Sequence, residues 1–329
     1  MSGVVRFGIV GTNFITDWVI RGGRCDDRFV PHALYSRTMA RANEYGDAHD
    51  IPLRFSNLHE MACCEEIDAV YIASPNVLHA QQALIFIEAG KHVLCEKPLA
   101  GYCAEAKMMF AAARRRGVLL MEAMKSTLSP NFRVLQEALP LIGSVRRYVA
   151  SFSQYSSRYD RLKAGEVLNA FRPELCNGAL MDIGVYALYP LIALFGKPSQ
   201  VLAQGIRLST GVDGLGAAIL AYPEMQGVVL FSKINDGYLP SEIEGERGTL
   251  IIDRVQHMDV IRLRMRGEAE VVLAEAPAMD EYYYEVKEFL DLIDAGALES
   301  HINSHATSIA TLEVMERVRR QIGVRFPRD

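Results

Sequence analysis

The chain has 329 residues, of which 50% are apolar and 23% charged, and its net charge is −5. A chain of this length is expected to form about two domains, and the composition is that of an ordinary globular protein. Because neither sign of charge dominates, the sequence argues against a nucleic-acid-binding protein and against a surface for anionic membranes.

No secretory or membrane-spanning segment is expected. The apolar run Val4–Val10 predicts a strand and lacks the charged start and cleavage site of a signal peptide. The longest uncharged run, Ile183–Gly196, is shorter than the roughly 18 residues of a spanning helix and contains Pro190. The six cysteines lack metal-site spacing, so we expect reduced thiols, a cytoplasmic protein and no metal.

The first strand leads into a turn where a dinucleotide-binding fold carries its glycine-rich loop, at a helix N-terminus. Against the pattern Gly-x-Gly-x-x-Gly the chain offers Gly11, Asn13 and Thr16, a partial match that a plain strand–helix turn would also give. Asn tolerates positive φ, so Asn13 is expected to replace the second glycine. The candidate cofactor-binding residues of this loop are Gly11, Thr12, Asn13, Phe14 and Ile15.

The second strand, Phe29–Tyr35, ends at Ser36 and Arg37. An acid at this place takes the ribose hydroxyls of NAD, whereas an arginine accommodates the 2′-phosphate of NADP. We therefore expect NADP, with NAD as the alternative, and Arg41 as a second support. A solvated arginine at a helix start would have the same sequence.

Strands and helices continue to alternate through Ala123, which predicts an α/β fold with a doubly wound parallel sheet. In such a sheet, ligands bind at the carboxyl ends of the strands. The strand Ile67–Ile72 is followed by Ser74, Pro75 and Asn76, with His79 in the next helix. A histidine at a helix start is more often structural than a ligand.

The strand Val93–Cys95 is followed at once by Glu96, Lys97 and Pro98. The proline disfavours helix at Lys97, so the lysine is expected in extended backbone just outside the sheet. An isolated Glu-Lys pair is usually solvated. Here, however, the preceding strand ends lead to the same edge, which favours a lysine that meets a cofactor.

After Ala123 the pattern changes to strands from Val145–Phe152 onward, with helices near the end over Tyr282–Ala295 and Ser304–Gly323. This predicts an antiparallel-rich sheet with helices on one face. The irregular stretch Ser153–Asn177 holds candidate substrate-recognition cations, which a solvated loop would also hold; they are Arg158, Arg161, Lys163 and Arg172.

The apolar helix predicted over Gly178–Leu188 is interrupted by Asp182, and Tyr186 lies four residues later on the same face. A buried acid on so apolar a helix needs a partner. Lys97 is the expected one. A structural aspartate beside a core tyrosine is the alternative.

The triplet Glu96-Lys97-Pro98 and the pattern Asp-x-Gly-x-Tyr from Asp182 to Tyr186 resemble the Gfo/Idh/MocA family. This family comprises the glucose-fructose oxidoreductase, inositol dehydrogenase and dimeric dihydrodiol dehydrogenase group of nicotinamide-dependent oxidoreductases. The resemblance spans nearly the whole chain. It implies a Rossmann domain over residues 1–124 and an α+β domain with a large, mostly antiparallel open sheet over residues 125–329.

The resemblance also implies an NAD(P)-dependent oxidoreductase that acts on a secondary alcohol or carbonyl of a sugar, polyol or trans-dihydrodiol. Lys97, Tyr186 and Asp182 are the expected catalytic residues. Ser74, Pro75, Asn76, His79, Glu96 and Lys97 are expected to bind the cofactor alongside Ser36 and Arg37. The tyrosine version of the motif favours an aldose or dihydrodiol over an inositol. A homodimer or homotetramer through the second sheet is expected. The alternative is a non-catalytic NADP-binding sensor.

Overall fold

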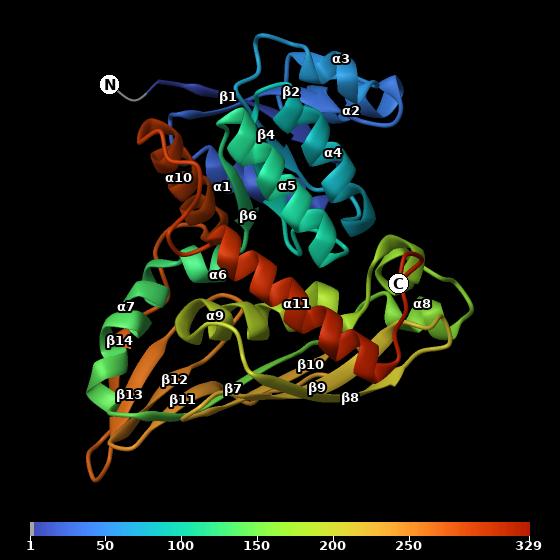
Figure 1. Ribbon diagram of the computed structural model, residues 1–329. Coiled ribbons are helices and arrows are strands. Elements are labelled where there is room, and N and C mark those ends of the chain that lie inside the picture. Colours follow the sequence, from blue (N-terminus) through green and yellow to red (C-terminus); the bar gives the residue numbers. More distant parts are fainter. Residues whose placement is uncertain (1–2) are drawn as a thin grey trace. The chain divides into compact units, whose positions relative to one another are not determined.

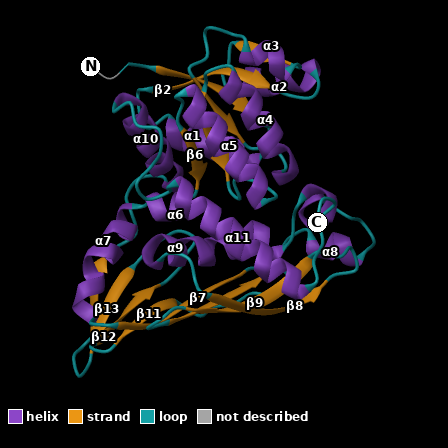
Figure 2. Cartoon of the chain, in the orientation of Figure 1, coloured by secondary structure: helices purple, strands orange, loops and turns teal. Residues whose placement is uncertain are grey.

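The computed structural model describes residues 3–329, which divide into two compact units (Figure 1). The first unit consists of the chain up to Lys125 together with Met279–Ser308. The second consists of Ser126–Ala278 and Ile309–Asp329. Each unit is built around one sheet, which Figure 2 shows in orange.

The first unit has a six-stranded sheet in the order β3-β2-β1-β4-β5-β6, and its strand pairs are parallel. This is the doubly wound order of a dinucleotide-binding fold, and it confirms the predicted parallel α/β sheet. Its elements are β1 (Val5–Val10), α1 (Phe14–Gly23), β2 (Phe29–Tyr35), α2 (Met39–Ala48), β3 (Leu53–Phe55), α3 (Leu58–Ala62), β4 (Ala69–Ile72), α4 (Asn76–Glu88), β5 (His92–Glu96), α5 (Cys103–Arg116), β6 (Leu120–Ala123) and α10 (Glu281–Asp294).

The late helix α10 packs against α1, where Figure 1 shows it in red. Tyr282 lies on Trp18, with ring centroids 5.8 Å apart, and its backbone approaches Gly22 so closely that a Cβ there would lie 2.8 Å from it. Phe289 reaches the β1 side chain Phe7. The sequence analysis places this helix beside the second sheet, whereas in the structure its apolar face packs in the first unit, against α1 and β1.

The second unit has an eight-stranded sheet in the order β14-β13-β12-β11-β7-β10-β9-β8. Neighbours are antiparallel except β7 and β10, which confirms the predicted mostly antiparallel sheet. Its strands are β7 (Val145–Ser153), β8 (Gln200–Arg207), β9 (Asp213–Ala221), β10 (Gln226–Ser232), β11 (Ser241–Gly245), β12 (Gly248–Ile252), β13 (Ile261–Met265) and β14 (Val271–Ala274).

Helices α7 and α9 and most of α11 cover one face of this sheet (Figure 1). The helices are α6 (Lys125–Leu128), α7 (Pro130–Ala138), α8 (Tyr159–Lys163), α9 (Val185–Phe195) and α11 (His305–Ile322), with 3₁₀ turns at Leu139–Ile142, Asn169–Phe171 and Pro173–Leu175 and a π-helical turn at Leu180–Gly184. The run Pro173–Phe195, with a mean hydropathy of 1.7, is long and apolar enough to cross a membrane, but 72% of its most apolar window is buried. Such burial is typical of the core helix of a soluble protein.

Candidate functional site

The glycine loop after β1 is shaped to bring backbone close to a ligand. Gly11 has φ +129°, a backbone conformation that residues with a side chain rarely adopt. A Cβ at this position would lie 2.8 Å from the carbonyl oxygen of Ala73. The loop ends at the N-terminus of the ten-residue helix α1. A helix N-terminus carries a partial positive charge that favours anions, and a part of Gly11, Thr12, Asn13, Phe14 and Ile15 in pyrophosphate binding stays a prediction.

Asn13 has a different role from the one expected. Its backbone is extended, with φ −112°, so positive φ is not the reason for an asparagine here. The side-chain oxygen accepts from Ile15 N–H at 2.9 Å, and the amide nitrogen donates to Ala73 O at 2.8 Å. Asn13 therefore caps α1 and ties the glycine loop to the end of β4.

The end of β2 carries two arginines with different surroundings. Arg37 is exposed, so its guanidinium is accessible to a ligand. Arg41 contacts the glycine loop: its guanidinium donates to Thr12 O at 3.0 Å and to Thr12 Oγ1 at 3.3 Å, and it also pairs with Glu44. Arg41 is thus fixed beside the loop, whereas Arg37 is exposed to solvent.

His79 links two of the candidate loops. It is buried, and its ring nitrogens lie 2.8 Å from Ser74 O and 3.0 Å from Pro98 O. Burial lowers the pKa of this histidine. His79 therefore joins the turn that begins α4, Ser74-Pro75-Asn76, to the turn after β5, and its part in cofactor binding stays a prediction.

Glu96, Lys97 and Pro98 end β5, the strand beside β4, with a cis peptide bond between Lys97 and Pro98. Glu96 points into the unit, where its carboxylate accepts from Tyr71 Oη at 2.7 Å and from Lys97 N–H at 3.2 Å. Lys97 is half-buried at the sheet edge. The predicted cofactor residues of the first unit thus share one edge of its sheet.

Two further acids of the first unit are buried, and one of them holds this turn. Glu122 on β6 accepts from Leu99 N–H at 2.9 Å. Glu285 on α10 is buried, and neither of its carboxyl oxygens has a hydrogen-bond partner among the described residues. Burial raises the pKa of Glu285 above its usual range, and the nearby Glu96 adds to this shift. Both effects disfavour the charged form of the Glu285 carboxyl.

In the second unit, Asp182 and Tyr186 stand out by exposure. Every residue from Gly178 to Ile192 is buried except these two. The Tyr186 ring packs edge-on against Phe152, with centroids 5.9 Å apart. The π-helical turn that holds Asp182 is a deformation often found at functional sites. The predicted pair therefore projects from an otherwise buried helix.

Asp182 pairs with a residue that the sequence analysis missed. Its carboxylate forms an ion pair with Lys233, which follows β10 and is 6% exposed in its side chain. Lys97, the expected partner, belongs to the other compact unit, and its pairing with Asp182 stays a prediction. The only feature of the sequence that could have pointed to Lys233 is its place directly after an apolar strand. This feature does not identify Asp182 as its partner, because the two residues are 51 positions apart in the sequence.

The irregular stretch between β7 and the apolar helix forms a small packed body. Leu162, Ala170 and Phe171 make a buried cluster with Val212. Two of its candidate cations are already paired locally, because Arg161 binds Glu166 and Lys163 binds Asp160. Arg172 is also bonded locally, because its Nε donates to Val167 O at 3.3 Å, and a part of these cations in substrate recognition stays a prediction.

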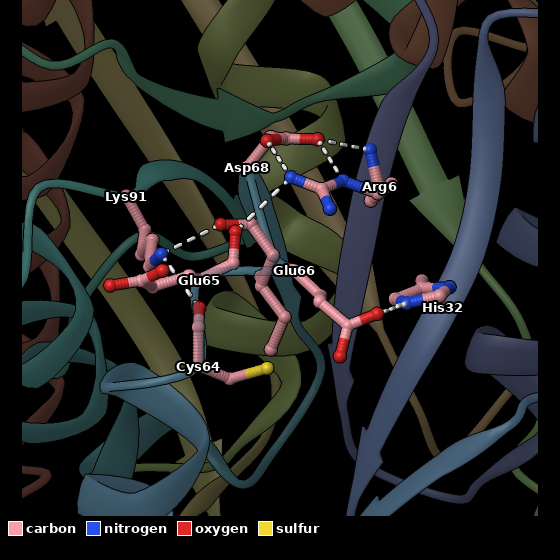
Figure 3. A network of polar contacts seen from close by, with 8 residues as sticks. Arg6, His32, Cys64, Glu65, Glu66, Asp68 and Lys91 are labelled. Carbon is pink, nitrogen blue, oxygen red and sulfur yellow. Dashed lines mark hydrogen bonds and ion pairs between the residues drawn. The ribbon is translucent and has the colours of Figure 1, made fainter.

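A hollow of about 470 Å³ lies at the opposite, amino-end edge of the first unit's sheet. Asp68 and Lys91, which line it, belong to the polar network of Figure 3: Asp68 pairs with Arg6 at 2.8 Å, and Lys91 donates to the carbonyl oxygens of Cys64 and Ile67. This network closes the ends of the strands. Within residues 3–329, no group of three or more His, Cys, Asp or Glu side chains is arranged to hold a metal ion.

The strand order of the first unit and its glycine loop are those of a dinucleotide-binding Rossmann domain. Residues 5–124 match the model of the oxidoreductase family with an NAD-binding Rossmann fold, GFO_IDH_MocA, and residues 140–251 match the GFO/IDH/MocA C-terminal domain. The chain belongs to the Gfo/Idh/MocA family. This confirms the predicted family, fold class and NAD(P)-dependent oxidoreductase activity.

Relatives are similar over the full chain. The scyllo-inositol 2-dehydrogenase (NADP(+)) IolU of Bacillus subtilis is 47% identical and covers 99% of both chains. The trans-1,2-dihydrobenzene-1,2-diol dehydrogenase of Sus scrofa is 30% identical and covers 99% of this chain and 98% of its own. Among solved structures, a levoglucosan dehydrogenase in complex with NADH and levoglucosan has a TM-score of 0.87 at 19% identity, covering 97% of each chain.

Proposed function

We propose that the protein is an NADP-dependent dehydrogenase that interconverts a secondary alcohol and a ketone on a cyclic polyol. The 47% identical relative is named a scyllo-inositol dehydrogenase that uses NADP, and this supports both the substrate class and the cofactor. The same relative counts against the preference for an aldose or dihydrodiol over an inositol that the tyrosine motif suggested.

The observation that carries the proposal is the exposure of Asp182 and Tyr186 on a helix whose other residues are buried from Gly178 to Ile192. Core packing does not require a carboxylate and a phenol at these places, and a buried helix gains nothing from them. A site for a hydroxyl-bearing substrate does require such groups. Retention of Lys97 at the end of β5 fits the same chemistry.

The proposed roles follow from the chemistry of each side chain. A bound nicotinamide ring accepts or supplies the hydride. The Lys97 ammonium stabilises negative charge that develops on the substrate oxygen, and Lys97 and Tyr186 are the groups that accept or return the hydroxyl proton. Asp182 balances the positive charge of Lys233, with which it forms an ion pair. Glu96 and Glu122 hold the backbone turn that carries Lys97 through bonds to Lys97 N–H and Leu99 N–H.

The preference for NADP is proposed from the end of β2. Ser36 and Arg37 stand where an acid would bind the ribose of NAD, and Arg37 is exposed and able to receive a phosphate. Arg41 lies beside the same loop through Thr12 and adds a second positive charge. Two arginines at this position favour a 2′-phosphate over a 2′-hydroxyl.

We further propose a cytoplasmic homodimer or homotetramer formed through the second sheet. Leu202 and Ile206 on β8 and Ile219 on β9 are exposed, by 65%, 55% and 43%, although they lie in strands of a large sheet. Leu202 and Ile219 are register partners, so these side chains share one face. An apolar patch of this kind is typical of an interface between subunits. Analytical ultracentrifugation of the wild type and of Ile219→Lys tests the proposal, because the charge should produce monomers.

The test of function is a screen for reduction of NADP and NAD across inositols, aldoses, other polyols and trans-dihydrodiols. We expect turnover with at least one inositol and a higher kcat/KM with NADP than with NAD. Tight binding of NADPH without turnover of any compound would instead support a sensor that keeps the fold.

A further inference from the structure

We infer that Lys233 is a positioning residue of the substrate site, which holds the Asp182 carboxylate ionised and oriented. This inference rests on the proposed function, because it assigns a partner to one of the proposed catalytic groups. It concerns residues of the second unit alone. The contacts on both sides of the pair carry the argument.

The backbone of Lys233 is fixed from both sides. Its N–H donates to Gly214 O on β9 at 2.8 Å, and its carbonyl oxygen accepts from Ser156 N–H at 2.9 Å. The preceding residue, Ser232, accepts from the N–H groups of Ile234 and Asn235 and donates to the Asn235 side chain at 2.6 Å. The backbone of Lys233 therefore lies in a hydrogen-bonded turn, which fixes the starting point of its side chain.

The side chain of Lys233 is nearly buried. It is 6% exposed, passes over the ring of Phe171 with Nζ 6.0 Å from the ring centroid, and ends at Asp182. Phe171 itself is fully buried in the packed body of the irregular stretch. A lysine in such surroundings loses most of its hydration, so the carboxylate of Asp182 is required to compensate its charge.

The turn that carries Asp182 is held by a buried acid, Asp213, which is 2% exposed. Asp213 on β9 accepts from Leu180 N–H, at 2.6 Å, in the π-helical turn that carries Asp182. Gly178 comes so close to Asp213 Oδ1 that a Cβ would lie 2.1 Å from it, so the turn is tightly packed on this acid. Asp213 thus fixes the backbone of Asp182, and Lys233 fixes its side chain.

The exposure of the pair is asymmetric, and this points to function. Asp182 is 37% exposed in its side chain while its partner is buried. A purely structural pair on a surface gains little stability and needs no buried member. A buried lysine behind an accessible carboxylate keeps that carboxylate ionised and directs it toward solvent or substrate. Titratable groups close to it within this unit include Lys233, in direct contact, Asp213, which holds the same turn, and Tyr186, four residues along the chain.

The experiment compares four single variants by steady-state kinetics on the substrate found in the screen. Lys233→Met removes the charge at similar size, Lys233→Gln keeps a donor, and Lys233→Arg keeps the charge. Lys197→Met is the matched control, because Lys197 pairs with Glu313 in the same unit but is 48% exposed in its side chain. Thermal unfolding of each variant reports its folded fraction.

We expect kcat/KM per folded enzyme to fall by about a hundredfold in Lys233→Met and Lys233→Gln, to recover to within about tenfold in Lys233→Arg, and to stay unchanged in Lys197→Met. The acid limb of the kcat profile should move to higher pH in Lys233→Met, because the carboxylate loses its counter-charge. The double variant Asp182→Asn/Lys233→Met should be no slower than Asp182→Asn alone.

Three results would overturn the inference. The first is a normal kcat/KM in Lys233→Gln, and the second is an acid limb of the kcat profile that does not move in Lys233→Met. The third is a double variant in which the losses of activity of the two single variants simply add. Each would show that Lys233 acts on folding alone. If Lys233→Met does not fold, Lys233→Gln and Lys233→Arg decide the question. Absence of turnover in the wild type would overturn the proposed function, whereas turnover in the wild type together with normal kcat/KM in Lys233→Gln would overturn only the role of Lys233.

Discussion

The buried carboxyl of Glu122 makes the stability of the first unit depend on pH in a definite direction. Glu122 lies on β6 with 2% of its surface exposed, directly behind the turn that carries Lys97. Its Oε1 accepts from Leu99 N–H at 2.9 Å. Burial raises the pKa of this carboxyl to about 7, against hydrogen bonds from Ser308 and Leu99 that lower it.

The sign follows from proton binding. Between the unfolded value of 4.5 and about 7, the folded protein holds a proton at Glu122 that the unfolded chain has released. Stability from this group is therefore present at low pH and is lost as the pH rises through this window. At about 1.4 kcal/mol for each pKa unit, the shift amounts to roughly 3 kcal/mol lost by pH 8.

The informative variant is Glu122→Gln, which keeps an acceptor for Leu99 N–H but cannot ionise. Its new amide donors cost about 1 kcal/mol or more if they lack partners. The variant should therefore be slightly less stable than the wild type at pH 4.5 and about 1–2 kcal/mol more stable at pH 8. For a unit of this size, that is an increase of roughly 2–8 °C in the melting temperature.

Differential scanning calorimetry at intervals from pH 4.5 to pH 8 measures both curves, with Glu137→Gln as the control at a carboxyl 69% exposed in its side chain. The melting temperatures of Glu122→Gln and the wild type should cross within the window, and those of the control should not. Parallel curves for Glu122→Gln and the wild type would refute the reasoning, because the carboxyl would then titrate alike in the folded and unfolded states.

Two further predictions concern the reaction and the cofactor. Lys97→Ala should lower kcat by at least about a hundredfold and leave the NADPH dissociation constant nearly unchanged, as measured by fluorescence titration; ordinary activity would remove Lys97 from the catalytic residues. Arg37→Ala should weaken NADPH far more than NADH, because only NADPH carries the 2′-phosphate. Equal losses for both cofactors would assign the phosphate to another group, with Arg41→Ala as the next variant to measure.

Much of the first unit could be predicted because its signals are local. The alternation of apolar runs with helices, the glycine at Gly11 and the Glu-Lys-Pro turn all depend on neighbours in the sequence. The place of Asn13 in the loop before α1 could be predicted, but the reason for an asparagine there could not. Its bond to Ala73 O crosses 60 residues, and capping looks the same in a sequence as tolerance of positive φ.

The parts that sequence reasoning missed depend on contacts between distant segments. Lys233 ends an apolar strand and shows no periodic relation to Asp182, so their ion pair follows only from the order of β9 and β10 over the apolar helix. The position of α10 is a similar case. Its amphipathic pattern predicts a helix with one apolar face, and many surfaces can accept such a face.

The return of residues 279–308 to the first unit has a consequence for how the protein is made. On a ribosome, the stretch up to Lys125 emerges early, but the surface around Trp18 and Gly22 stays bare until α10 has been translated. An amino-terminal fragment that stops at Lys125 should therefore expose apolar surface and aggregate. Adding α10 as a separate peptide should restore the solubility of this fragment. The first unit is therefore the first to be synthesised, but it can complete its fold only after most of the chain has been translated.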